Sequence, residues 1–112
     1  MARISTHVLD TARGMPAAGV VIQLHACHDG ERQHLATLAT NADGRGSGPE
    51  LEAGVYELTF HAGNYFRAAG VDLPDPPFLD DIVIRFGIAD PSGRYHVPLL
   101  LAPYSYSTYR GW

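Results

Sequence analysis

The sequence predicts an all-β protein folded as a two-sheet sandwich with one short helix, and three features indicate this fold. Short runs of β-branched and aromatic residues with alternating polarity recur along the chain. Clusters of Gly, Pro, Asn and Asp separate these runs at short spacing. No repeat, linker or low-complexity tract divides the 112 residues. We therefore expect a single domain over residues 1–112, with about eight strands.

Each expected strand is closed by turn-forming residues. The strands cover residues 4–9, 20–26, 33–40, a stretch that includes Leu51, and residues 55–61, 81–89, 94–102 and 104–112. The turns include Asn41-Ala42-Asp43-Gly44 and the hairpin signal Asp90-Pro91-Ser92-Gly93. Residues 64–70 are the one helix candidate, because Asn64 can cap its start and Gly70 can end it.

The composition excludes several classes of protein. With 46% hydrophobic and 18% charged residues, the chain has the balance of an ordinary globular domain. Lys is absent and the net charge is -4, which argues against a nucleic-acid or anionic-membrane surface and excludes catalysis through a lysine Schiff base. No apolar run approaches the roughly 20 residues of a membrane span, and the N-terminus lacks a signal-peptide core. The single cysteine, Cys27, cannot form an internal disulfide.

Two histidines occupy outward positions on expected strands. Because side chains alternate along a strand, His7 points away from the better core face, and His96 does the same on the strand over residues 94–102. The face that His96 shares with Pro98 and Leu100 is too apolar for a free surface, so we expect it to be buried against another subunit. Pro98 also has no backbone N–H to donate to a neighbouring strand, which indicates an edge strand or an irregular position. Two alternatives stand here: a hydrogen-bonded bystander at His7 and a dimer patch without chemistry at His96.

Arg45 and the end of the chain could complete a site. Arg45 follows Asp43-Gly44, so we expect the turn to project it from a sheet end, the alternative being a solvated turn arginine. The last seven residues carry three aromatics and an arginine behind an apolar run, so we expect this tail to be docked rather than frayed. Alternation along the last strand places Tyr109 outward and Arg110 on the opposite face. Two histidines and an arginine suit hydrolysis of an anionic, planar, amide-like substrate, because histidine transfers protons near neutral pH and arginine holds an oxyanion bidentately.

A metal site is not expected. The segment His25-Ala26-Cys27-His28 places His25 and Cys27 on one strand face, and His34 could approach from the paired strand. No second pair of metal-binding residues accompanies them, so the pattern falls short of a zinc site.

Both ends of the chain resemble the signatures of a known family, the 5-hydroxyisourate hydrolases, which are transthyretin-like enzymes of urate breakdown. These proteins typically open with a Ser-Thr-His-Val-Leu-Asp strand, matched here by residues 5–10, and end in Tyr-Arg-Gly-Ser, matched here by Tyr109-Arg110-Gly111. The Asp43-Gly44-Arg45 turn and the segment Arg94-Tyr95-His96-Val97-Pro98-Leu99-Leu100-Leu101 extend the resemblance, which covers the whole chain. It implies the transthyretin fold and a homotetramer with active sites at subunit interfaces.

The resemblance also implies an activity, the hydrolysis of 5-hydroxyisourate to 2-oxo-4-hydroxy-4-carboxy-5-ureidoimidazoline in urate catabolism, with no metal or organic cofactor. The matching positions make His7, Arg45 and His96 the catalytic residues. The histidines would deprotonate a water and protonate the leaving nitrogen, with the choice of base left open, while Arg45 would stabilise developing negative charge. The residues expected to bind the substrate are His7, Arg45, Tyr109, Arg110, Gly111 and Trp112.

Trp112 departs from the family's pattern, which ends in Ser. Trp has no hydroxyl and offers a single N–H donor, and its bulk would crowd a small pocket. The alternatives are that only the backbone and terminal carboxylate matter at this position, or that Trp112 turns outward. Two other functions are kept as alternatives: a transthyretin-type small-ligand carrier, and a catalytically inactive transthyretin-like module in which Trp112 marks lost catalysis. We expect a bacterial cytoplasmic protein, or a periplasmic one if the chain is a trimmed mature form.

Overall fold

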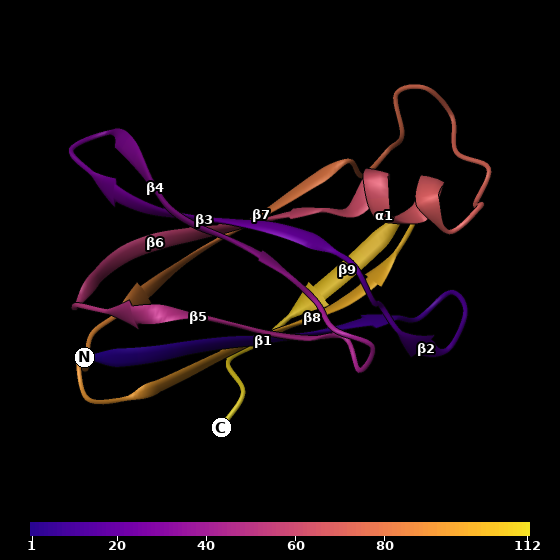
Figure 1. Ribbon diagram of the computed structural model, residues 1–112. Coiled ribbons are helices and arrows are strands. Elements are labelled where there is room, and N and C mark those ends of the chain that lie inside the picture. Colours follow the sequence, from indigo (N-terminus) through magenta and orange to yellow (C-terminus); the bar gives the residue numbers. More distant parts are fainter.

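The computed structural model describes all residues 1–112 and contains the elements β1 (Ala2–Asp10), β2 (Met15–Pro16), β3 (Val21–His28), β4 (Glu31–Ala39), β5 (Arg45–Leu51), β6 (Gly54–His61), α1 (Ala62–Ala68), β7 (Asp81–Ile88), β8 (Arg94–Ala102) and β9 (Ser105–Thr108). Two sheets face each other (Figure 1). The first has the order β2–β1–β8–β9, with β5 also paired to β1, and the second has the order β4–β3–β6–β7. Strands β1 and β8 pair in parallel, whereas the other pairs are antiparallel.

The predicted two-sheet sandwich with one helix is confirmed, and the differences lie at the ends of elements. The short strand β2 was not predicted, β5 begins at Arg45, and β9 ends at Thr108 instead of continuing to the end of the chain. The predicted helix start was wrong, because α1 begins at Ala62 and Asn64 lies inside it rather than capping it. Strand β6 runs directly into α1, and Gly63 donates its N–H to the carbonyl of Asp80 (3.1 Å), so a tertiary contact sets the helix start. No helix in the structure has the length and hydrophobicity to cross a membrane.

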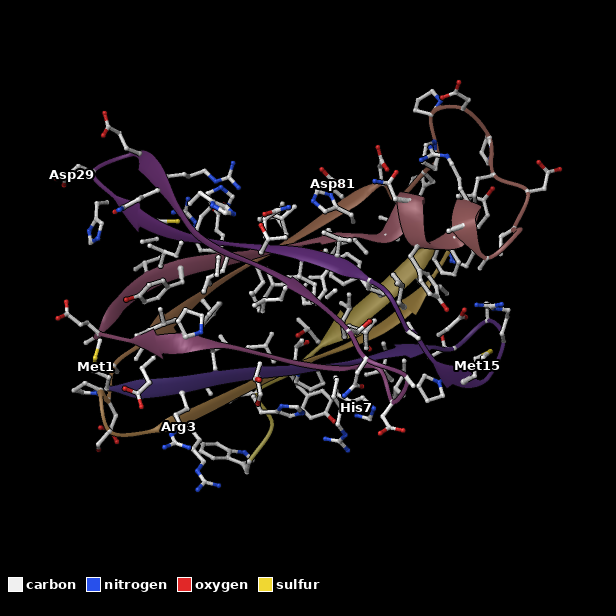
Figure 2. All side chains as sticks on the ribbon, viewed as in Figure 1. Met1, Arg3, His7, Met15, Asp29 and Asp81 are labelled. Atoms are coloured by element: carbon white, nitrogen blue, oxygen red, sulfur yellow. The ribbon has the colours of Figure 1, made fainter.

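The hydrophobic core lies between the two sheets (Figure 2). The alternation predicted for the first strand is confirmed, since Ile4, Thr6 and Val8 are buried while Ser5 and His7 on the opposite face are half-buried. The large side chains with almost no exposed surface are Phe60, Phe66, Ile22, Leu24, Leu58, Leu99 and Leu101. Inward burial on β1 and β8 therefore fixes which of their residues face outward.

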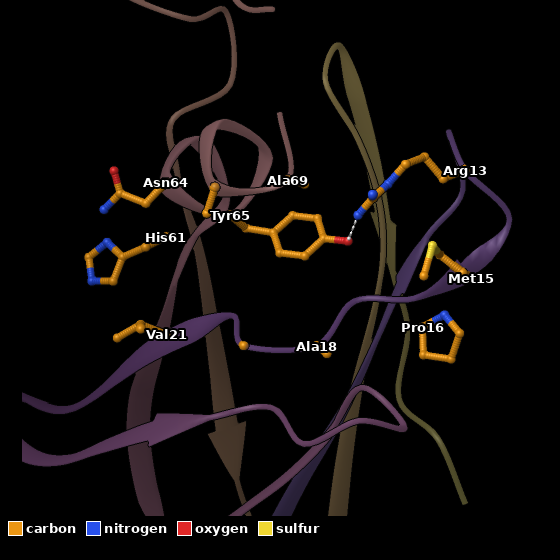
Figure 3. A pocket seen from close by; sticks show the side chains of 11 residues that line it. Arg13, Met15, Pro16, Ala18, Val21, His61, Asn64, Tyr65 and Ala69 are labelled. Atoms are coloured by element: carbon orange, nitrogen blue, oxygen red, sulfur yellow. Dashed lines mark hydrogen bonds between the residues drawn. The ribbon is translucent and has the colours of Figure 1, made fainter. Parts of the chain in front are cut away.

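A buried polar cluster ties the end of β1 to α1. The carboxylate of Asp10 is fully buried and accepts hydrogen bonds from Nε of Arg13 (2.8 Å) and from the hydroxyl of Tyr65 (2.8 Å). Burial by itself would raise the pKa of Asp10, but the hydrogen bonds from Arg13 and Tyr65 outweigh it and hold that pKa below its ordinary value. Arg13 also donates to the Tyr65 hydroxyl (2.7 Å), the bond drawn in Figure 3. This cluster fixes the strand that carries His7.

Candidate active site

Three neighbouring strands bring His7, Arg45 and His96 to the outer face of the first sheet. His7 of β1 is the register partner of Arg45 of β5. Two residues earlier, Ser5 of β1 is the register partner of Ser47 on one side and of His96 on the other. His7 and His96 therefore lie diagonally on adjacent strands with Arg45 beside them. Arg45 is the first residue of β5, so it projects from the sheet next to His7 rather than from the turn itself.

The turn before β5 orients His7. Nε2 of His7 lies 3.0 Å from the carbonyl oxygen of Asp43. A carbonyl only accepts, so Nε2 carries the hydrogen and Nδ1 of the neutral ring is left unprotonated. The side-chain oxygen of Asn41 accepts from the backbone N–H of Asp43 (2.9 Å) and of Arg45 (3.0 Å), which holds the turn. Gly44 has a φ of 75°, and a Cβ there would collide with the backbone of β1.

His96 is held from two sides. Its Nδ1 lies 2.9 Å from the hydroxyl oxygen of Ser5, and its carbonyl accepts from the N–H of Gly111 (2.8 Å). A Cβ at Gly111 would lie 2.5 Å from Cδ2 of His96, so only glycine fits against the ring. Burial lowers the pKa of His96 below its ordinary value of 6.5, and the neighbouring Arg45 and His7, in that order, lower it further. The ring is therefore neutral at neutral pH and able to accept a proton.

Pro98 explains why the tail leaves the ladder after β9. Strand β9 pairs with β8 up to Thr108, whose hydroxyl donates to the carbonyl of Pro98 (2.7 Å). Pro98 has no N–H to continue the ladder on that side. Pairing resumes only at the bridge between His96 and Gly111. The irregularity predicted at Pro98 and the docking predicted for the tail are both confirmed, and residues 109–110 lie outside the ladder.

Two cavities flank His96. The first, which we call the polar groove, has a volume of about 300 Å³ and is also lined by Arg45, Ser5 and Ser47. The second has a volume of about 340 Å³ and lies between the edge of β7 and the tail, where Tyr109 and Arg110 line it with His96. The expected last strand was too long, because β9 ends at Thr108 and strand alternation does not extend to Tyr109 and Arg110.

The remaining tail residues are held by aromatic contacts. The guanidinium carbon of Arg110 lies 4.3 Å from the ring centroid of Tyr95 and 4.1 Å from that of Trp112. Nη2 of Arg110 also donates to the carbonyl of Arg94 (3.1 Å). The side chain of Trp112 is nevertheless 98% exposed, so it turns outward, one of the placements expected for it.

Three contributors to the site were missed from the sequence: Ser5, Asn41 and Tyr95. Ser5 shares the predicted outward face with His7, but its pairing with His96 depends on the parallel register of β1 and β8. Asn41 had a local signal, since an asparagine that opens a turn commonly accepts hydrogen bonds from the backbone two residues on. Tyr95 had no such signal, because its contact with Arg110 is made only in the folded chain.

The largest cavity, of about 520 Å³, lies away from these residues, between α1 and the segment over residues 13–21 (Figure 3). It includes His61, whose Nδ1 lies 2.8 Å from a carboxylate oxygen of Asp81, and none of the predicted catalytic residues. On the second sheet, the rings of His25 and His34 lie 5.3 Å apart, and Arg32 lies 3.3 Å from Nδ1 of His25. No group of three or more His, Cys, Asp and Glu side chains is arranged to hold a metal ion.

Comparison with known proteins gives consistent matches. Residues 4–111 match the profile of the HIUase/Transthyretin family. The chain is 57% identical to 5-hydroxyisourate hydrolase 2 of Rhizobium meliloti, over 97% of this chain and 95% of that protein. The structure of Klebsiella pneumoniae 5-hydroxyisourate hydrolase superposes with a TM-score of 0.82 at 39% identity and covers both chains completely. Sea bream transthyretin in complex with thyroxine also superposes with a TM-score of 0.82, at 29% identity, covering 96% of this chain and 93% of that one.

Proposed function

The chain belongs to the HIUase/Transthyretin family, and from this premise we infer that it hydrolyses 5-hydroxyisourate to 2-oxo-4-hydroxy-4-carboxy-5-ureidoimidazoline in urate catabolism. The observation that carries the inference is the grouping of His7, Arg45 and His96 on three adjacent strands. Arg45 and His96 line the polar groove, and His7 is the register partner of Arg45. Proton-transfer groups beside an unpaired arginine suit the hydrolysis of a cyclic amide.

The catalytic steps follow from the two imidazoles and the guanidinium. Water in the polar groove attacks a ring carbonyl carbon of the substrate while His96, neutral because of its lowered pKa, accepts a water proton. Nδ1 of His7, left free by the Asp43 contact, orients that water. Arg45 stabilises the oxyanion that forms on the carbonyl oxygen. When the C–N bond breaks, the imidazolium returns its proton to the leaving nitrogen, and a carboxyl group and an N–H result.

The substrate contacts of the tail are part of the same proposal. Tyr109 borders the second cavity beside His96, and we expect its hydroxyl to donate to the substrate. Gly111 lets the backbone approach the His96 ring, and Arg110 lines the same cavity as Tyr109. Trp112 turns outward and lines neither cavity, so its expected part in substrate binding would be made by its backbone or terminal carboxylate.

We further propose that the functional unit is a homotetramer in which another subunit covers the outer face of β1 and β8. In the single chain this face carries Leu9 paired with Leu100 directly beside the catalytic row, and both side chains are only half-buried. An apolar strip of this kind beside an open site favours burial by a second copy. Sedimentation equilibrium of the purified protein tests the assembly, and a monomer that turns over substrate normally would contradict it.

The carrier alternative has less support. Sea bream transthyretin in complex with thyroxine shares the fold. The outer face described here instead presents two histidines and an arginine without a carboxylate partner, a more polar lining than a carrier of a largely apolar ligand favours. The bacterial cytoplasmic location stays a prediction, which fractionation of the source cells would test.

The deciding experiment follows the ultraviolet decay of freshly generated 5-hydroxyisourate with and without the protein, where spontaneous hydrolysis is slow. We expect clear acceleration that is proportional to protein concentration. A correctly folded protein without any effect would exclude the hydrolase and favour a binding protein or an inactive relative.

A further inference from the structure

We propose that Trp112 is a positioning residue for His96, and the proposal rests on the hydrolase function inferred above. By stacking on Arg110, Trp112 holds the tail so that Gly111 stays against the histidine. Its role is thus to anchor the chain behind a catalytic group, in a position where the family pattern has a serine.

The tail needs such an anchor because few backbone bonds hold it. The β8–β9 ladder stops at Thr108, and Pro98 cannot donate the next hydrogen bond. Beyond that point a single bridge, from the N–H of Gly111 to the carbonyl of His96 (2.8 Å), returns the tail to the sheet. One hydrogen bond at a chain end opens easily, so the position of Gly111 depends on its neighbours.

Those neighbours flank Gly111 and contact each other. Arg110 precedes it and Trp112 follows it, and their side chains stack at 4.1 Å. Arg110 is itself fixed to β8 by the ring of Tyr95 (4.3 Å) and by the carbonyl of Arg94 (3.1 Å). A guanidinium over aromatic rings is attracted to their π faces. The two residues that flank Gly111 are therefore joined to each other, and Arg110 connects the pair to β8.

The contact of Gly111 with His96 matters for catalysis because it is very close. The ring leaves no room for a Cβ at position 111, so the tail backbone covers one side of the imidazole. Release of the tail would hydrate the ring and loosen the orientation that Ser5 alone would then have to maintain. The other groups that face His96 are His7 and Arg45 from the neighbouring strands and Arg110 from the tail, and removal of the Trp112 ring leaves their charges in place.

The stack can be tested without any enzyme assay, because Trp112 is the only tryptophan in the chain. Intrinsic fluorescence therefore reports on this residue alone. We expect Arg110→Ala to lower the fluorescence anisotropy of Trp112 and to increase its quenching by acrylamide, with Arg110→Lys in between because lysine keeps the charge but not the planar group. Identical anisotropy and quenching in the parent and Arg110→Ala would overturn the stack as the anchor of Trp112. The ring would then be either free or held by another subunit, and in neither case by Arg110.

The positioning role is tested by kinetics of Trp112→Ala and Trp112→Phe. We expect Trp112→Ala to lower kcat roughly tenfold with little change in KM, because the proton-transfer group loses its alignment. The acid limb of the pH profile of kcat for Trp112→Ala should also move to higher pH. Burial is the first cause that lowers the pKa of His96, so a more hydrated ring has a higher pKa. Trp112→Phe, which keeps an aromatic face, should recover most of the loss.

The outcomes separate this proposal from the proposed function. A parent protein without hydrolase activity but with a fluorescence response to Arg110→Ala would contradict the hydrolase and the positioning role while leaving the stack established. An active parent in which Trp112→Ala has normal kcat and an unshifted pH profile would overturn the positioning role alone. Equal losses in Trp112→Ala and Trp112→Phe would also overturn it, because then the aromatic face is not what matters.

Discussion

The two outer faces of the sandwich carry similar side chains in different states. On the second sheet, Glu57 accepts from Arg32 (2.8 Å) and Arg85 (2.9 Å), so its carboxylate balances the arginine charge on that face. On the first sheet, Arg45 forms no ion pair with a carboxylate, and its charge lowers the pKa of His96 more than that of any other residue does. Both faces hold histidine and arginine, but only the first has a cation without a balancing anion.

This difference shows which face is prepared for a ligand. Because an arginine that is already paired has little left to offer an oxyanion, we interpret the second face as a structural ion-pair network around the buried carboxylate of Glu57. The unpaired Arg45 beside a neutral His96 can interact with a substrate or a transition state without first breaking a protein contact. The presence of histidine and arginine on a strand is therefore a weaker sign of function than the absence of a carboxylate beside them.

The largest expected effect comes from removing the unpaired groups. We expect His7→Ala, Arg45→Ala and His96→Ala each to reduce kcat/KM for 5-hydroxyisourate at least about a hundredfold, because each removes proton transfer or oxyanion stabilisation. The measurement is the ultraviolet assay with purified variants whose fold is verified by circular dichroism.

The second face offers the matched control for these variants. Arg85→Gln removes an arginine from an equally exposed strand position but leaves the polar groove unchanged. Its turnover should stay within about twofold of the parent, the scatter of a surface substitution. A loss as large as that of Arg45→Ala would mean that the difference between an unpaired and an ion-paired arginine does not explain the activity.

An added carboxylate should give the first face the balanced arginine charge that the second face has. Ser47 lies two residues from Arg45 on the same strand face and lines the polar groove. We expect Ser47→Asp to lower kcat/KM roughly tenfold, because the new carboxylate pairs with Arg45 and repels an anionic substrate. The neutral isostere Ser47→Asn controls for size, and equal activity of the two variants would argue against a role for the uncompensated charge.

Loss of the carboxylate on the second face should affect stability and not activity. We expect Glu57→Gln to reduce the free energy of unfolding by about 1 kcal/mol at neutral pH, since it loses charge-assisted hydrogen bonds. The hydrogen bond from Arg85 is the first cause that lowers the pKa of Glu57 below its ordinary value of 4.5, so the advantage of glutamate is complete above that pH. It should diminish as the pH falls through the folded-state pKa. Urea unfolding of both proteins between pH 3 and pH 7 measures this, and a constant difference would contradict the linkage.

The smallest effect concerns the titration of His96. Burial is the first cause of its lowered pKa, and the positive charge of Arg45 is the second. Arg45→Gln removes that charge, makes protonation easier and should raise the pKa of His96 toward 6.5 without restoring it fully. NMR titration of the imidazole resonances provides the measurement. An unchanged pKa would place Arg45 too far from His96 for the proposed joint action.

The local pattern predicted the strands better than their ends. Alternation in residues 4–9 and 94–102 placed His7 and His96 outward, and the structure agrees. Prediction failed at α1, whose start is set by contact with Asp80 and not by Asn64, and in the tail, where alternation stopped with the ladder. Both failures occur where a distant segment, rather than the neighbouring residues, provides the hydrogen-bond partners.

The sequence by itself determined the sandwich class, the outward faces of two histidine-bearing strands, the turn that carries Arg45 and the family signatures at both ends. These depend on side-chain alternation and turn chemistry, which act over a few residues. Only the tertiary structure decided that β1 and β8 run parallel, in the register that places Ser5 beside His96. It also decided that Glu57, and not Arg45, lies in an ion-pair network. The stacking of Trp112 on Arg110 is likewise seen only in the folded chain. Such pairings join residues that are distant in sequence, and they are selected by the packing of the whole core.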